Sequence, residues 1–105
     1  TCLVGSEMCI RDRLSDPNKK VLVMCHHGVM VIGDDVADAF NRLFYFERAA
    51  ETYIKALWTG QPLRVLSDEV AEKTARELEE YPGQAERHFD ELKAILDCEE
   101  PDYAQ

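Results

Sequence analysis

The sequence predicts an α/β chain in which two short strands are followed by three helices. Two apolar runs flank a Cys-His-His-Gly turn, a 3.6-residue apolar period begins near residue 36, and two further helical segments follow capping or breaking signals. At 105 residues the chain is one domain at most. Its hydrophobic content of 46%, with only five Gly and four Pro, is typical of a folded chain.

The two predicted strands lie at 21–24 and 29–32. Each is a continuous apolar run, which is typical of a strand buried on both faces. The turn at 25–28 separates them by only a few residues. This spacing allows either two neighbouring strands joined by a tight turn, or one bent strand with a bulge at Gly28.

A long helix is predicted at 35–58. Asp34 or Asp35 can cap its first turn, and Gly60 followed by Pro62 ends it. The apolar side of this helix consists of positions 36, 40, 43, 50, 54 and 57. Aromatic and alanine residues widen this stripe, so we expect the helix to be largely buried.

Two further helices are predicted at 67–80 and 84–97. Ser67 caps the first of them, and the Tyr-Pro-Gly run at 81–83 separates the two. Residues 99–102 form an acidic tail that we expect to be frayed.

Glu47 falls on the apolar side of the long predicted helix, where a hydrophobic residue would be expected. A buried carboxylate is costly unless it is paired. We therefore expect Glu47 to meet a cation, a backbone donor or the histidine turn. A structural hydrogen bond is favoured over a catalytic role, because most buried polar groups are simply satisfied.

Composition excludes several classes of partner. The formal net charge of −9, from 12 basic and 21 acidic residues, argues against nucleic acid or an anionic membrane surface, because phosphates would be repelled. No apolar run approaches the roughly 20 residues that cross a bilayer. The four cysteines are widely spaced and follow no secretory signal, which predicts reduced thiols in a cytoplasmic protein.

Residues 1–13 read TCLVGSEMCIRDR and show no helix or strand period. They resemble translated sequencing-adapter runs that contain SEMCIRDR, so we expect an artefact or a disordered extension here. Residues 14–105 are then the informative part, and we expect them to be the C-terminal part of a larger domain. The two Val-rich strands support this expectation, because a lone pair of strands is marginal in water.

The histidine turn is the part of the sequence most able to carry chemistry, and we interpret it as part of a metal site. A neutral imidazole binds Zn²⁺ and similar ions, and a strand end can aim one ring into a cleft. Adjacent residues of an extended chain point to opposite faces, so His26 and His27 are not expected to bind one ion. Neither Cys25 nor His88 has the spacing to complete a site. A pair of hydrogen-bonded histidines that caps a sheet edge is an equally open interpretation.

The stretch VLVMCHHGVMVIGDDVADAFNRLFYFERAAETYIKAL, residues 21–57, resembles the class II aldolase/adducin family. The shared features are an apolar strand, a His-Gly pair, a second apolar strand, a Gly, and an acidic-capped helix with Ala-Phe and aromatic-Glu-Arg-Ala segments. The resemblance implies a partial three-layer α/β/α sandwich around a mostly antiparallel sheet. It also implies a homo-oligomer, usually a tetramer.

The resemblance also implies a metal site. In enzymes of this family, three histidines hold a zinc ion, two from an upstream His-x-His and one from the His-Gly. By position, the ligand here is His27, directly before Gly28. The metal would stabilise an enediolate during aldol cleavage or condensation of a small hydroxy-carbonyl substrate. The upstream His-x-His and the acidic catalytic residue are absent from this sequence, so catalytic and substrate-binding residues stay unassigned and the chain alone is expected to be inactive.

Two functions follow from the resemblance. The first is part of a zinc-dependent, aldolase-type lyase, with epimerase or dehydratase branches of the same metal chemistry. The alternative is a non-catalytic, adducin-like interaction domain, because one fold hosts different functions. A small stand-alone module, whose histidines only cap the strands, is a third interpretation.

Overall fold

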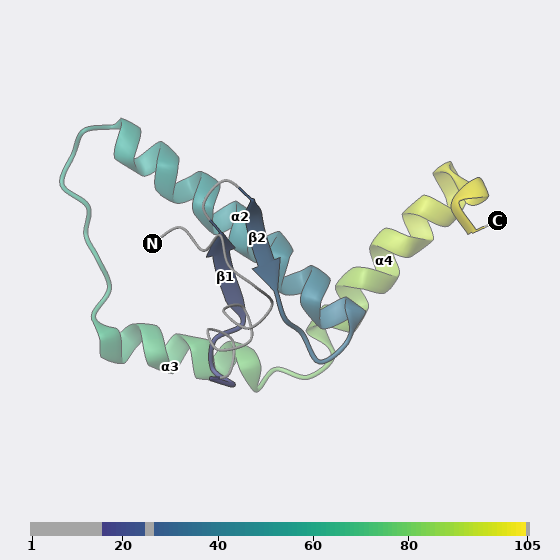
Figure 1. Cartoon of the computed structure of the whole chain (residues 1–105), viewed down its shortest axis with the longest axis horizontal. Coiled ribbons are helices and arrows are strands. Elements are labelled where there is room, and N and C mark those ends of the chain that lie inside the picture. The colour runs from purple at the N-terminus through teal and green to yellow at the C-terminus, as the bar shows by residue number, and fades with distance from the viewer. Residues whose placement is uncertain (1–15, 25–26, 105) are drawn as a thin grey trace.

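The computed structural model describes residues 16–24 and 27–104, whose arrangement is shown in Figure 1. The elements in order are β1 (Val21–Met24), β2 (Gly28–Val31), α2 (Val36–Trp58), α3 (Asp68–Glu79), α4 (Gln84–Glu99) and the 3₁₀ helix η1 (Pro101–Ala104). The predicted order of two short strands and three helices is therefore confirmed. The predictions for residues 1–13, Cys25 and His26 lie outside the described residues.

The two strands form an antiparallel hairpin, so the tight-turn alternative is the one observed. Val21 pairs with Val31 and Met24 pairs with Gly28. The backbone N–H of His27 donates to the carbonyl oxygen of Met24 at 3.2 Å and closes the turn.

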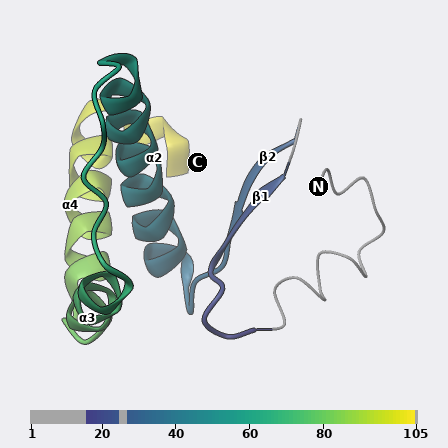
Figure 2. The same cartoon turned by 90° about the vertical axis from the view of Figure 1, so that its left-hand side faces the viewer.

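The prediction that both faces of these strands are buried is wrong for the described residues, because the side chain of Val23 is 64% exposed. Figure 2 shows the reason: the hairpin stands on one side of α2, and α4 lies on the other side. Only one face of the hairpin can therefore be covered by these helices. Within the described ranges, the helices lie on one side of the hairpin, as expected for part of the predicted sandwich.

A sharp corner joins β2 to α2. A Cβ atom on Gly33 would lie 2.3 Å from the backbone nitrogen of Ala39, so only glycine fits there. The side chain of Asp35 then accepts the backbone N–H of Asp38 at 2.8 Å and caps the helix. These two positions allow α2 to start close against the end of β2.

The other helix boundaries agree closely with the sequence signals. Thr59 is the C-cap of α2, and Gly60 follows at a φ of 66°, which is the left-handed conformation that favours glycine. Ser67 caps α3 and accepts the N–H of Val70 at 3.4 Å. The tail is not frayed as expected, because Tyr103 in η1 donates its hydroxyl to the carboxylate of Asp97.

The best-covered part of the molecule lies between α2 and α4. The Phe44 ring lies 4.5 Å from the His88 ring, and the Phe40 ring lies 5.7 Å from the Phe89 ring, both in edge-on arrangements. Even so, none of the described residues is fully buried. None of the described helices is long and apolar enough to cross a membrane.

Candidate functional site

His27 lies at the tip of the hairpin, where its residue is exposed. Gly28 follows with a φ of 99° and open space around it, so the turn depends on the left-handed conformation and not on close packing. The His27 side chain is therefore accessible at the end of the strand. It is compatible with a ligand position and equally with a surface histidine.

A metal site needs more donors than His27. A catalytic zinc ion commonly takes three protein ligands. Across residues 16–24 and 27–104, no group of three His, Cys, Asp or Glu side chains is placed to hold a metal ion. The described residues alone therefore do not fit the zinc site that the resemblance implied, and His27 as a ligand stays a prediction.

Glu47 is exposed on α2, so the prediction that it is buried and paired is wrong. The period placed it on the apolar stripe, but the described hairpin and α4 cover only parts of that stripe. Its neighbour Arg48 lies over the ring of Phe44, with its Cζ atom 4.3 Å from the ring centroid. His88 does not contribute to the turn. Its Nδ1 atom lies 3.0 Å from Asn41 Oδ1 inside the α2–α4 contact.

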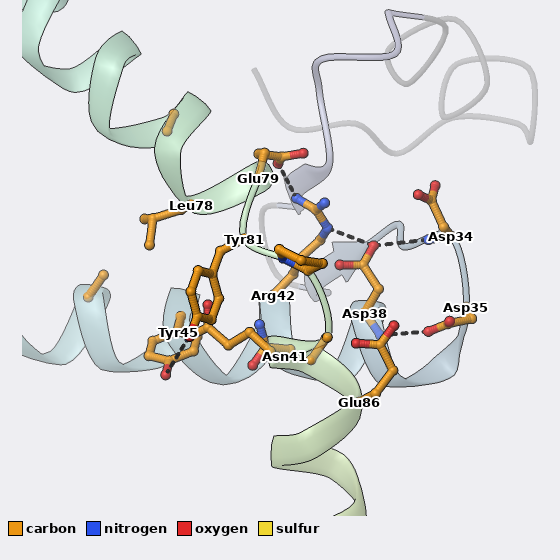
Figure 3. Close-up of a pocket in the computed structure, with 16 residues that line it drawn as sticks. Asp34, Asp35, Asp38, Asn41, Arg42, Tyr45, Leu78, Glu79, Tyr81 and Glu86 are labelled. Carbon is orange, nitrogen blue, oxygen red and sulfur yellow. Dashed lines mark hydrogen bonds and ion pairs between the residues drawn. The ribbon is translucent and has the colours of Figure 1, made fainter.

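A groove of about 860 Å³ lies between α2, the end of α3 and the start of α4. Figure 3 shows Arg42 at its centre, reaching toward the carboxylates of Asp38 and Glu79. Arg42 Nε donates to Asp38 Oδ2 at 3.0 Å, and Arg42 Nη1 donates to Glu79 Oε1 at 2.8 Å. We call these three side chains the Arg42 clamp.

The clamp shifts the titration of each member. The hydrogen bond from Arg42 holds the pKa of Glu79 below its ordinary value. For Asp38, partial burial acts to raise the pKa, but the Arg42 side chain and the backbone N–H of Asp34 together keep it lowered. The bond to Glu79 in turn raises the pKa of Arg42, although burial opposes this.

The clamp is best understood as a structural connection between two helices. An arginine that is held by two carboxylates has its charge compensated and its donors engaged. It also joins residues 37 positions apart in the sequence. Sequence reasoning missed Arg42, although its four-residue spacing from Asp38 on one helix is a signal that could have indicated half of the clamp.

A second polar contact also closes the groove toward α4. The Gln84 side-chain amide donates to the hydroxyl of Tyr45 at 3.5 Å, and Tyr45 packs edge-on against Phe44. The groove therefore combines carboxylates at one end with aromatic and apolar side chains at the other. The sequence did not indicate this groove, because its walls come from three separate helices.

Comparisons with known proteins match the hairpin and most of α2 to a family. Residues 5–54 match the family model described as Class II Aldolase and Adducin N-terminal domain. This match begins within the segment 1–13, whose boundary stays a prediction. No solved structure matches the chain.

The curated relatives are adducins and one related protein. Human beta-adducin is 42% identical over 41 residues, which cover 39% of this chain and 6% of that protein. The Drosophila melanogaster protein hu-li tai shao is 30% identical over 82 residues, which cover 77% of this chain and 7% of that protein. The chain thus spans only a small part of the length of these relatives. The family match over residues 5–54, together with the likeness to beta-adducin, assigns this part of the chain to the class II aldolase/adducin family.

Proposed function

We propose that the chain is part of an adducin-like interaction domain that acts by association and not by catalysis. The observation that carries this proposal is the apolar surface at the end of α2 and in the linker that follows it. Trp58 is 78% exposed and Val65 is 85% exposed. Soluble proteins rarely leave extended apolar surface uncovered, and such surface commonly marks an interface.

This surface is more than two isolated side chains. Tyr53 of α2 is 59% exposed, and it lines the same hollow as Val65 of the linker. Leu57 and Leu66 are also at least half exposed. We name these five residues the α2–linker patch. The likeness to human beta-adducin supports an interaction role, because the adducin branch is the non-catalytic alternative that the resemblance implied.

The proposed partner is a second copy of the same protein, in a cytoplasmic homo-oligomer. Apolar side chains contribute most to self-association when they become fully desolvated at the centre of an interface. Both copies carry a net charge of −9 and repel each other, so the uncharged side chains of the patch must supply the attraction. Self-association buries the α2–linker patch without requiring any ligand.

The test is the molar mass of the intact parent protein, measured by size exclusion with light scattering. Trp58→Ser should shift the protein toward monomer, because it removes the largest side chain of the patch. Val36→Ser is the matched control, since Val36 lies on the same helix, at its other end, and is 72% exposed. A parent protein that is monomeric before any substitution would contradict the proposal.

A second candidate function is an aldolase-type lyase acting on a small hydroxy-carbonyl substrate. The specific observation that favours it is the exposed His27 beside the left-handed Gly28 at the hairpin tip. The further ligands of a divalent metal, with zinc the preferred ion, would then have to come from residues outside the described ranges. No catalytic or substrate-binding residue is proposed among the described ones.

Metal analysis of the intact parent protein separates the two functions. If the protein is a lyase of this kind, we expect about one zinc ion per subunit and a strongly reduced zinc content in His27→Ala. His88→Ala is the matched control, because His88 contacts Asn41 and aromatic rings of α2 instead of lying at the turn. Metal content that His27→Ala leaves unchanged would refute the ligand assignment. Lyase activity that this substitution abolishes would refute the non-catalytic proposal.

A further inference from the structure

Helix α3 is the least covered helix of the described chain. Every residue of Asp68–Glu79 is exposed. The helix is nevertheless amphipathic, because two adjacent apolar residues are followed by further ones four and three residues on. These positions are Val70, Ala71, Ala75 and Leu78. Because short amphipathic helices gain most of their stability by packing the apolar side, α3 lacks its main stabilising contact in this arrangement.

An apolar surface of α2 stands opposite this side of α3. Ala75 and Leu78 line the same groove as Tyr45 and Ala49 of α2. Leu78 is 61% exposed and Tyr45 is 49% exposed, so neither wall of the groove is yet covered. Figure 1 shows α2 and α3 running apart toward the linker that joins them.

The two helices are tied where they come closest. Glu79, the last residue of α3, binds Arg42 of α2 through the clamp at 2.8 Å. The opposite end of α3 is connected to α2 by the irregular segment 59–67, which contains Gly60 in the left-handed conformation. Gly83 provides a second left-handed position just beyond Glu79. A helix fixed at one end and flanked by such joints can swing about that end.

We propose that α3 is a hinged arm that pivots on the Arg42–Glu79 ion pair and closes its apolar side over the α2 wall of the groove. Closure removes Leu78 and Ala75 from water against Tyr45 and Ala49. The hydrophobic effect therefore favours the closed arrangement, while the linker resists it only through its conformational entropy. This arm concerns the fold of a single chain and does not rest on the proposed function.

The experiment measures the distance between the two helices in the full chain. Serine replaces all four cysteines, and Glu51→Cys on α2 and Lys73→Cys on α3 carry nitroxide labels. Both positions are well exposed, with side chains 63% and 77% accessible. Double electron–electron resonance, in samples diluted with unlabelled chain, should show a second and shorter distance beside the separation in the structure. A distribution that lacks the shorter distance, whether narrow or broad, would overturn the proposal.

Two pairs of variants test the cause of closure and the pivot. Leu78→Asn should lower the ratio of the short to the long distance by about tenfold, because it removes an apolar side chain from the closed contact. Leu92→Asn on α4 should leave that ratio unchanged. Equal effects of the two substitutions would overturn the proposal.

The pivot is tested within α3 itself. Glu79→Gln should broaden both distances, since the helix end loses its charged tie to Arg42. Glu77→Gln should not, because the ion pair that Glu77 makes is with Lys73 of the same helix, at 3.9 Å, and Lys73→Cys has already removed it in the labelled chain. If both variants behave alike, Glu79 is not the pivot and the hinged arm is refuted. Light scattering on the Trp58 variant reports on self-association separately, so the two proposals can fail independently.

Discussion

Helix α2 makes two very different contacts, and their difference shows what holds this chain together. Toward α4, the contact consists of aromatic rings, with Phe44 and Phe40 against His88 and Phe89. Toward α3, it consists mainly of the Arg42 clamp, whose Glu79 side chain is 54% exposed. Ring packing removes apolar area from water, whereas an exposed ion pair gains little because solvent screens it. We therefore expect the α2–α4 contact to dominate stability and the clamp to set geometry.

The largest expected effect follows from removing a ring on the α4 side. Phe44→Ala deletes the ring that contacts His88 at 4.5 Å and lies under Arg48. We expect the free energy of unfolding to fall by about 2–3 kcal/mol, less than for a fully buried Phe. Urea unfolding followed by circular dichroism measures this loss. Val65→Ala is the control, because Val65 is 85% exposed, and an equal loss in both variants would contradict the comparison.

The next largest loss of stability is expected at the corner between β2 and α2, where the backbone of the helix leaves no room for a side chain. Gly33→Ala places a Cβ atom 2.3 Å from the nitrogen of Ala39, so β2 and α2 must shift apart. We expect a loss of about 1–3 kcal/mol, as for other overpacked sites. Gly60→Ala is the comparison, since its Cβ would meet open space and only the left-handed conformation is strained. If Gly60→Ala destabilised the chain more than Gly33→Ala, the corner would not be the constraint we describe.

The local signals in the sequence predicted the elements of this fold well. Asp35, Gly60 and Ser67 act at helix ends through contacts within a few residues, so the sequence alone indicates their roles. The hairpin likewise needed only two apolar runs and a short turn. For the same reason, the order of elements and most helix boundaries were predicted correctly.

Contacts between distant elements could not be predicted in this way. Arg42 meets Glu79, and Asn41 meets His88, across 37 and 47 positions of sequence, which no periodicity encodes. Glu47 was misplaced for a related reason. A period identifies the apolar side of a helix, but which part of that side is covered depends on where other elements pack. His27 as a metal ligand stays a prediction, because the other two expected ligands belong to an upstream His-x-His that this sequence does not contain.

The smallest effect concerns the clamp, and its pH dependence identifies it. The folded pKa of Glu79 is lowered below its ordinary 4.5 by the Arg42 hydrogen bond, so folding is stabilised while Glu79 is ionised. This contribution is fully present above pH 4.5 and is lost as the pH falls through the lowered pKa; Asp38, lowered from 3.8, adds to it in the same direction. We expect Arg42→Gln to reduce the free energy of unfolding by about 0.5–1 kcal/mol at neutral pH, since solvent screens the exposed Glu79 carboxylate. The difference between wild type and variant should vanish in strong acid, where both carboxylates are protonated.

Lys73→Gln, which breaks an exposed pair within α3, should show no such pH-dependent difference. A difference for Arg42→Gln that persists unchanged in acid would mean that Arg42 stabilises the chain through packing of its aliphatic stem and not through its charge.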